Sequence, residues 1–190
     1  IRAEFGLTDT QISFLAGPAF VIFFVVFSFP FGRWVDVHSR RTIIAIGTML
    51  WSIAMIICGL ANSVWQMFIG RMGVGSGEAS INPAAYSIIP DYFPPDKRGF
   101  ATGIYVSGTA IGGGGALYLG GLLLDWAERT HPVLPFVGQL APWKILFLSL
   151  GVPGFIVGLL ILFLVGEPTR RKIAGHGSEP VPVREAIAYL

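Results

Sequence analysis

Charged side chains are scarce in this sequence. Aspartate, glutamate, lysine and arginine together make up 13% of its 190 residues, whereas an ordinary soluble domain contains about 25%. Hydrophobic residues make up 53%, and the mean hydropathy is +0.68. This charge is too little to cover the surface of a soluble domain, so the composition predicts an integral membrane protein.

Cysteine and histidine are also rare. The single cysteine, Cys58, excludes a disulfide within the chain. The three histidines, His38, His131 and His176, are scattered through polar loops at spacings that suit no metal site. No nucleophile and base form a recognisable set, so we expect no cofactor, no metal and no enzymatic activity. The net charge of +2 is small, and its short basic clusters between apolar runs argue against a nucleic-acid partner.

Long uncharged runs are present, by contrast. At ~1.5 Å per residue, about twenty apolar residues cross the ~30 Å hydrocarbon core of a bilayer. We therefore expect an all-α polytopic membrane protein with five transmembrane helices, over residues 12–31, 42–61, 64–90, 99–124 and 145–166. Residues 1–166 would form the membrane domain, and the polar residues 167–190 would begin a linker.

The basic residues predict how these spans are oriented. Nine lie in two turns and the tail, which we expect in the cytoplasm, and three lie on the opposite side. The nine are Arg33, Arg40, Arg41, Lys97, Arg98, Arg170, Arg171, Lys172 and Arg184. Residue 1 then lies outside although no secretory signal is visible. One further helix upstream is the simplest explanation, giving an incomplete six-helix half of the kind that secondary transporters pair.

The third span differs from the others because it contains polar residues. Arg71 and Glu78 are seven positions apart and Asn82 is eleven positions after Arg71, so all three fall on one helical face. A charge at bilayer depth costs at least ~2.5 kcal/mol. The stripe must therefore face partners or water. A purely structural buried pair is the alternative interpretation, although ~10 Å of helical rise separates the two charged residues.

Five motifs resemble a known family. They are GLTDTQ (6–11), GRWVDVHSRR (32–41), RMGVGSGEAS (71–80), DYFPPDKRGFATGIY (91–105) and GEPTRR (166–171). In this order they resemble the N-terminal half of a major facilitator superfamily transporter, from just before its second helix to the central linker, with the spinster-like branch most similar.

The resemblance implies a function and a set of partners. It implies a proton-coupled secondary transporter that works by alternating access and carries an amphipathic anionic lipid, such as a lysophospholipid or a sphingoid phosphate. A small organic anion such as a sugar acid is the alternative substrate, and a truncated fragment that does not transport is the alternative role. Expected partners are the substrate, protons, membrane lipids, the first helix and the C-terminal half. The expected location is the bacterial inner membrane or another cell membrane.

The resemblance also implies residue roles. Glu78 would be the proton-coupling carboxylate, and Arg71 would be its charge partner or would bind an anionic head. Asn82 would satisfy backbone hydrogen bonds or contact substrate. Between the first two expected spans, four residues match the superfamily's gating motif: Gly32, Asp36, Arg40 and Arg41. The alternative is a solvated turn that only sets topology, and Val37 and Ser39 depart from the family pattern.

Glycines are abundant in the expected span 99–124. A phosphate-binding loop would require a preceding strand and a following lysine, and neither is present. Glycines four residues apart let helix backbones approach closely. We therefore predict close packing at Gly73/Gly77, Gly99/Gly103, Gly108/Gly112 and Gly154/Gly158.

Overall fold

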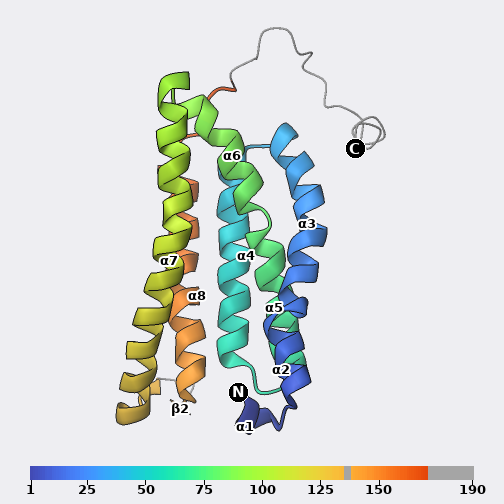
Figure 1. Ribbon diagram of the computed structural model, residues 1–190, viewed down its shortest axis with the longest axis vertical. Coiled ribbons are helices and arrows are strands. Elements are labelled where there is room, and N and C mark those ends of the chain that lie inside the picture. Colours follow the sequence, from blue (N-terminus) through green and yellow to red (C-terminus); the bar gives the residue numbers. More distant parts are fainter. Residues whose placement is uncertain (135–137, 171–190) are drawn as a thin grey trace.

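The computed structural model describes residues 1–134 and 138–170 of the chain (Figure 1). The tail positions named above, Arg171, Lys172, His176 and Arg184, lie outside the described residues. The described part is helical, with one small antiparallel hairpin that pairs Val133 with Gln139. The elements are α1 (Arg2–Phe5), α2 (Asp9–Ala16), α3 (Pro18–Val37), α4 (Arg40–Leu60), α5 (Val64–Glu78), α6 (Ile81–Tyr92), α7 (Pro95–Thr130), β1 (Val133–Leu134), β2 (Gly138–Gln139) and α8 (Pro142–Leu164).

The helices form an elongated bundle (Figure 1). Four described stretches are long and apolar enough to cross a membrane: Asp9–Val37, Arg40–Leu60, Pro95–Thr130 and Pro142–Leu164. The expected span 64–90 is not among these four and consists of α5 followed by α6. The predicted fold class, an all-α polytopic membrane protein, is confirmed.

Two of the expected spans are interrupted helices. The stretch 12–31 crosses Gly17, where α2 ends and Pro18 begins α3. The stretch 64–90 is broken at Ala79 and Ser80, midway along the bundle (Figure 1). The backbone there stays right-handed, but Pro83 has no N–H to donate to the carbonyl four residues earlier, so the helical ladder cannot continue unbroken.

Basic residues collect at one end of the bundle. There α3 and α8 finish and α4 and α7 begin (Figure 1). We call this the basic end, defined by Arg33, Arg40, Arg41, Lys97, Arg98 and Arg170.

The opposite end is closed by α1. The Trp143 indole N–H donates to Glu4 at 2.7 Å, and the buried Lys144 ammonium donates to the Asn62 side chain at 2.9 Å. These bonds fasten the start of α8 to α1 and to the turn between α4 and α5.

Glycines bring α5 against two neighbouring backbones. A Cβ at Gly77 would lie 2.5 Å from the Trp51 amide nitrogen on α4, and one at Gly75 would lie 3.1 Å from the Phe24 amide nitrogen on α3. On α8, a Cβ at Gly158 would lie 3.2 Å from the Ala45 carbonyl oxygen. Helix α5 is therefore clamped between α3 and α4, and α8 packs tightly on α4.

The glycines of α7 are different. Eight of them have nothing within 4 Å of the place a Cβ would occupy: Gly99, Gly103, Gly108, Gly112, Gly113, Gly114, Gly115 and Gly121. Within the described residues, close packing is therefore found at Gly73/Gly77 and Gly154/Gly158 but not at Gly99/Gly103 and Gly108/Gly112.

Candidate functional site

The break between α5 and α6 positions the polar stripe predicted from sequence. Glu78 is the last residue of α5, Arg71 lies two turns before it, and Asn82 lies in the first turn of α6. Arg71 and Glu78 are half-buried and Asn82 is exposed. Because glycines fix α5 against α3 and α4, the two charged residues are carried on a rigid segment.

Arg71 contacts an aromatic ring rather than a carboxylate. Its guanidinium carbon lies 5.4 Å from the centroid of the Phe147 ring on α8, a distance typical of a cation–π contact. Its Nε atom is buried and has no hydrogen-bond partner among the described residues. No ion pair joins Arg71 to Glu78 in the described part of the chain. The structure thus places both on α5 without bringing them together.

Two tyrosines that the sequence analysis did not single out complete this region. The Tyr105 hydroxyl on α7 donates to the Asn82 side-chain oxygen at 2.6 Å, and the Tyr105 ring meets Tyr86 edge-on, with centroids 5.5 Å apart. Tyr105 also lies within electrostatic range of Glu78. Tyr86 follows Asn82 by four residues, so their shared helical face was a readable signal. The pairing with α7 was not readable, because it depends on how two helices pack.

The gating motif is only partly brought together. Arg40 is 2% exposed and its guanidinium pairs with Asp91 of α6 and with Glu167, which follows α8, at 2.9 Å in the second case. Arg41 donates its backbone N–H to Glu167 at 2.8 Å. Asp36 is exposed and has no hydrogen bond or ion pair with the described residues. A Cβ placed at Gly32 would have no atom within 4 Å, so no described residue packs closely against this glycine.

Glu167 is the residue that organises the basic end, a role that was not predicted from the sequence. It accepts hydrogen bonds from the backbone N–H groups of Arg40 and Arg41, at 3.2 and 2.8 Å, and from the Ser39 hydroxyl at 2.8 Å. These backbone donors have no partner inside the helix at the N-terminus of α4, and the helix dipole favours an anion there.

The environment of Glu167 also changes its acidity. Partial desolvation opposes ionisation, but the hydrogen bonds from the Arg41 N–H, the Ser39 hydroxyl and Arg40 outweigh it and lower the pKa of Glu167 to about 2. Glu167 is therefore held as a carboxylate that joins α8 to the start of α4. A glutamate directly after a span, opposite a basic helix start, was the signal available in the sequence.

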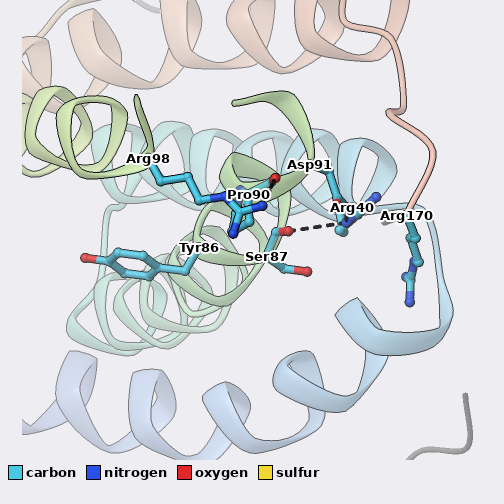
Figure 2. Close-up of a pocket in the computed structure, with 7 residues that line it drawn as sticks. All are labelled: Arg40, Tyr86, Ser87, Pro90, Asp91, Arg98 and Arg170. Atoms are coloured by element: carbon cyan, nitrogen blue, oxygen red, sulfur yellow. Dashed lines mark hydrogen bonds and ion pairs between the residues drawn. The ribbon is translucent and has the colours of Figure 1, made fainter. Parts of the chain in front are cut away.

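A pocket of about 290 Å3 opens beside this network (Figure 2). Figure 2 shows Arg40 reaching towards Ser87 and Arg98 reaching towards Pro90, from opposite sides of α6. Seven residues line the pocket: Arg40, Tyr86, Ser87, Pro90, Asp91, Arg98 and Arg170. In residues 1–134 and 138–170 no three histidine, cysteine or acidic side chains group as a metal site would require.

Comparison with known proteins gives a consistent relationship. The model of the Major Facilitator Superfamily matches residues 1–190. The chain is similar to the crystal structure of a bacterial homologue of the human lysosomal transporter Spinster, in an inward-facing and occupied conformation. The TM-score is 0.76 and the identity 32%, covering 89% of this chain and 40% of that one.

Curated relatives include transporters of two kinds. A probable L-galactonate transporter of Escherichia coli is 26% identical over 84% of this chain and 32% of its own length. A sphingosine-1-phosphate transporter of Danio rerio is 26% identical over 90% of this chain and 31% of its own length. The chain thus spans about a third of the length of these relatives. The family match and these similarities confirm the resemblance found in the motifs: the chain is an integral membrane protein of the major facilitator superfamily and belongs to its spinster-like branch.

Proposed function

We propose that this chain forms part of a proton-coupled secondary transporter that works by alternating access and carries an amphipathic anionic lipid, a lysophospholipid or a sphingoid phosphate. The observation that carries the proposal is the half-buried Arg71 and Glu78 beside the helix break, which form no ion pair with the described residues. Two unneutralised charges at bilayer depth are costly, and such residues commonly mark substrate and proton pathways.

Glu78 is the proposed proton carrier. An ionised Glu78 at this depth costs free energy. Binding a proton removes that cost and so changes the relative free energies of the conformations that expose Glu78 to the two sides of the membrane. Tyr105 of α7 interacts electrostatically with Glu78, Tyr86 of α6 packs on Tyr105, and Arg71 lies two turns away on α5. Proton uptake at Glu78 would therefore change the electrostatic environment of residues on α5, α6 and α7.

Arg71 is the proposed contact for the anionic head. Its buried Nε lacks a partner among the described residues, and the neighbouring Phe147 ring is apolar. A guanidinium can bind a phosphate through two parallel hydrogen bonds. An anionic head at Arg71 would satisfy donors that the described chain leaves unused.

An apolar groove supports a lipid as the substrate. It lies between α7 and α8, has a volume of about 600 Å3, and its side chains are mostly aliphatic, including Ile111, Leu119, Leu146 and Leu150. Leu146 and Leu150 lie on the helix that also carries Phe147. A sugar acid would require several hydrogen-bonding side chains, and this groove offers little beyond Ser149.

A sugar acid is the second candidate substrate. The similarity to a probable L-galactonate transporter favours it, as does the Tyr105–Asn82 pair, which offers hydrogen-bonding groups one turn beyond Glu78. Because the chain spans about a third of these relatives, a truncated product that does not transport is the remaining alternative.

Binding to the full-length transporter that contains these residues would test the substrate class. Its melting midpoint in detergent should rise with lysophospholipids or sphingoid phosphates, because a ligand of the native state stabilises it, and this rise should disappear in Arg71→Ala. Arg129→Ala, a change at an exposed arginine far from the break, is the matched control. A rise with sugar acids alone would replace the lipid with the second candidate.

Proton coupling has its own test. In proteoliposomes with an imposed pH gradient, Glu78→Gln should abolish the dependence of uptake on that gradient while binding of substrate persists. Unaltered pH-dependent transport in this variant would remove Glu78 from the role.

The remaining proposals concern orientation and gating. The basic end would face the cytoplasm, and the exposed Asp36 would contact the other half of the transporter when that side closes, with Gly32 allowing the close approach. Distance measurements between spin labels on the two halves would check this. An unchanged inward-to-outward ratio in Asp36→Asn would exclude the role.

A further inference from the structure

We infer that the pocket at the basic end is a binding site for a phosphate-bearing anion, separate from the Arg71 and Glu78 region. The pocket has a volume of about 290 Å3 and lies between α4, α6, the start of α7 and the segment after α8 (Figure 2). This volume exceeds what a phosphate group alone needs, so bridging waters fit as well.

The charges around the pocket do not balance. Three arginines and one aspartate line it. Arg40 is matched by Asp91 and Glu167, but Arg98 and Arg170 form no ion pair with any carboxylate in the described part of the chain. Within the described residues the three arginines stand against two carboxylates, Asp91 and Glu167, so one net positive charge is left at the pocket.

Backbone carbonyls hold both arginines in place. Arg98 donates its Nε–H to the Phe93 carbonyl at 3.3 Å and one Nη group to the Pro90 carbonyl at 3.0 Å. Arg170 donates one Nη group to the Val35 carbonyl at 2.7 Å and to the His38 carbonyl at 2.8 Å. Carbonyls orient a guanidinium but do not neutralise it, so the arginines are pre-positioned while their charge remains available.

Capping of α6 is the simpler explanation for Arg98, because Pro90 lies in the last turn of that helix. Capping accounts for the Nε and one Nη group only. The other Nη group of Arg98, and that of Arg170, have no acceptor among the described residues. Each arginine thus keeps one Nη group, with two N–H donors, that can donate to the oxygens of a phosphate.

The shared ligand chemistry is a phosphate group, and two sources can present it at the end of a transmembrane bundle. One is an anionic phospholipid whose headgroup lies at the membrane surface. The other is a soluble phosphate compound. The full-length transporter in detergent, given inorganic phosphate or phosphatidylglycerol, separates these two sources.

The experiment measures the melting midpoint against sodium phosphate, with sodium chloride at the same ionic strength as reference, and against phosphatidylglycerol with phosphatidylcholine as reference. The wild type should be stabilised by at least one of the two phosphate probes. The double substitution R98Q/R170Q should weaken the apparent Kd by about tenfold or more. The control R33Q removes an exposed arginine at the same end, outside the pocket, and should behave like the wild type.

Each outcome decides the proposal. Stabilisation by phosphatidylglycerol alone assigns the site to a lipid headgroup, and stabilisation by phosphate assigns it to a soluble anion. If R98Q/R170Q does not fold, R98K/R170K keeps the charge and removes the paired donors, and should still weaken binding. Absence of stabilisation in the wild type by either probe, or equal stabilisation in R33Q and the pocket variant, overturns the inference.

Discussion

Helices α5 and α7 are both rich in glycine, yet they are held in opposite ways. Glycines of α5 lie against α3 and α4, whereas eight glycines of α7 have nothing within 4 Å of the place a Cβ would occupy, within the described residues. Side-chain contacts that link α7 to the rest include the Tyr105–Asn82 bond, the Tyr86 ring, the apolar edge of α8 and, at the start of α7, the bonds from Arg98 to two backbone carbonyls. The spacing of glycines therefore does not by itself determine whether a helix is closely packed. Close packing also requires the surface of a neighbouring helix opposite those glycines. Helices α3, α4, α5, α6 and α8 form an anchored block, and among the long helices α3, α4, α5, α7 and α8 it is α7 that is least contacted by other elements.

Removal of Arg40 should damage the anchored block most. Arg40→Ala takes away a buried guanidinium that pairs with Asp91 and Glu167, and loss of one partner from a buried ionic network costs about 3–5 kcal/mol. Thermal unfolding of the full-length protein should show a large drop in midpoint. Arg33→Ala, at an exposed site of the same end, should change stability by less than about 0.5 kcal/mol. Equal effects would show that the network does not hold the block together.

A single methyl group tests the difference between α5 and α7 directly. Gly77→Ala would place a Cβ 2.5 Å from the Trp51 amide nitrogen and 2.7 Å from the Gly47 carbonyl oxygen, and such overpacking costs about 1–3 kcal/mol. Gly113→Ala adds the same group where nothing lies within 4 Å, and should be neutral or stabilising by up to about 1 kcal/mol. If both variants lower the melting midpoint by the same amount, a further segment of the full-length protein packs on α7.

Acid should loosen the block at the link between α8 and α4. The pKa of Glu167 is about 2 in the folded chain and about 4.3 when unfolded. The stabilisation that the ionised Glu167 gives to the folded state is thus complete above about pH 5 and is lost as pH falls towards 2. The side chain is 27% exposed, so after solvent screening we expect a loss of about 1–2 kcal/mol. Midpoints recorded from pH 7 to pH 3 should fall more steeply for the wild type than for Glu167→Gln; parallel curves would contradict this.

The smallest expected effect is at the junction between the block and α7. Tyr105→Phe removes the hydrogen bond to Asn82 and should cost about 0.5–1 kcal/mol. Hydrogen exchange should quicken in α7 and remain unchanged in α4. Tyr118→Phe, on an exposed part of α7, is the matched control. Unchanged exchange in α7 would mean that Tyr105 does not restrain this helix.

Much of the fold was predictable because bilayer thickness determines how long an uncharged run must be. Pro83 was the signal in the sequence for the break at Ala79 and Ser80. The spacing of seven residues between Arg71 and Glu78 indicated a shared helical face, but Asn82 lies on α6, beyond the break, so one helical period does not join it to the other two.

Contacts between distant segments were not predictable from the sequence. Glu167 meets Arg40 across 127 positions, and Tyr105 meets Asn82 across 23. Both contacts depend on which helices become neighbours, and local periodicity carries no information about that. For the same reason the sequence predicted close packing for the glycines of α7 as well as those of α5.

Helix α7 is longer than the hydrocarbon core of the bilayer is thick. Its 36 residues extend ~54 Å, and even a tilt of about 40° leaves ~41 Å along the membrane normal, more than the ~30 Å hydrocarbon core. The exposed Lys97 and Glu128, near its two ends, must then lie in water on opposite sides. A membrane-impermeant amine reagent added to sealed vesicles will label Lys97 from one side only. Labelling of Lys97 therefore shows on which side of the membrane the start of α7 lies, and hence how the full-length protein is oriented.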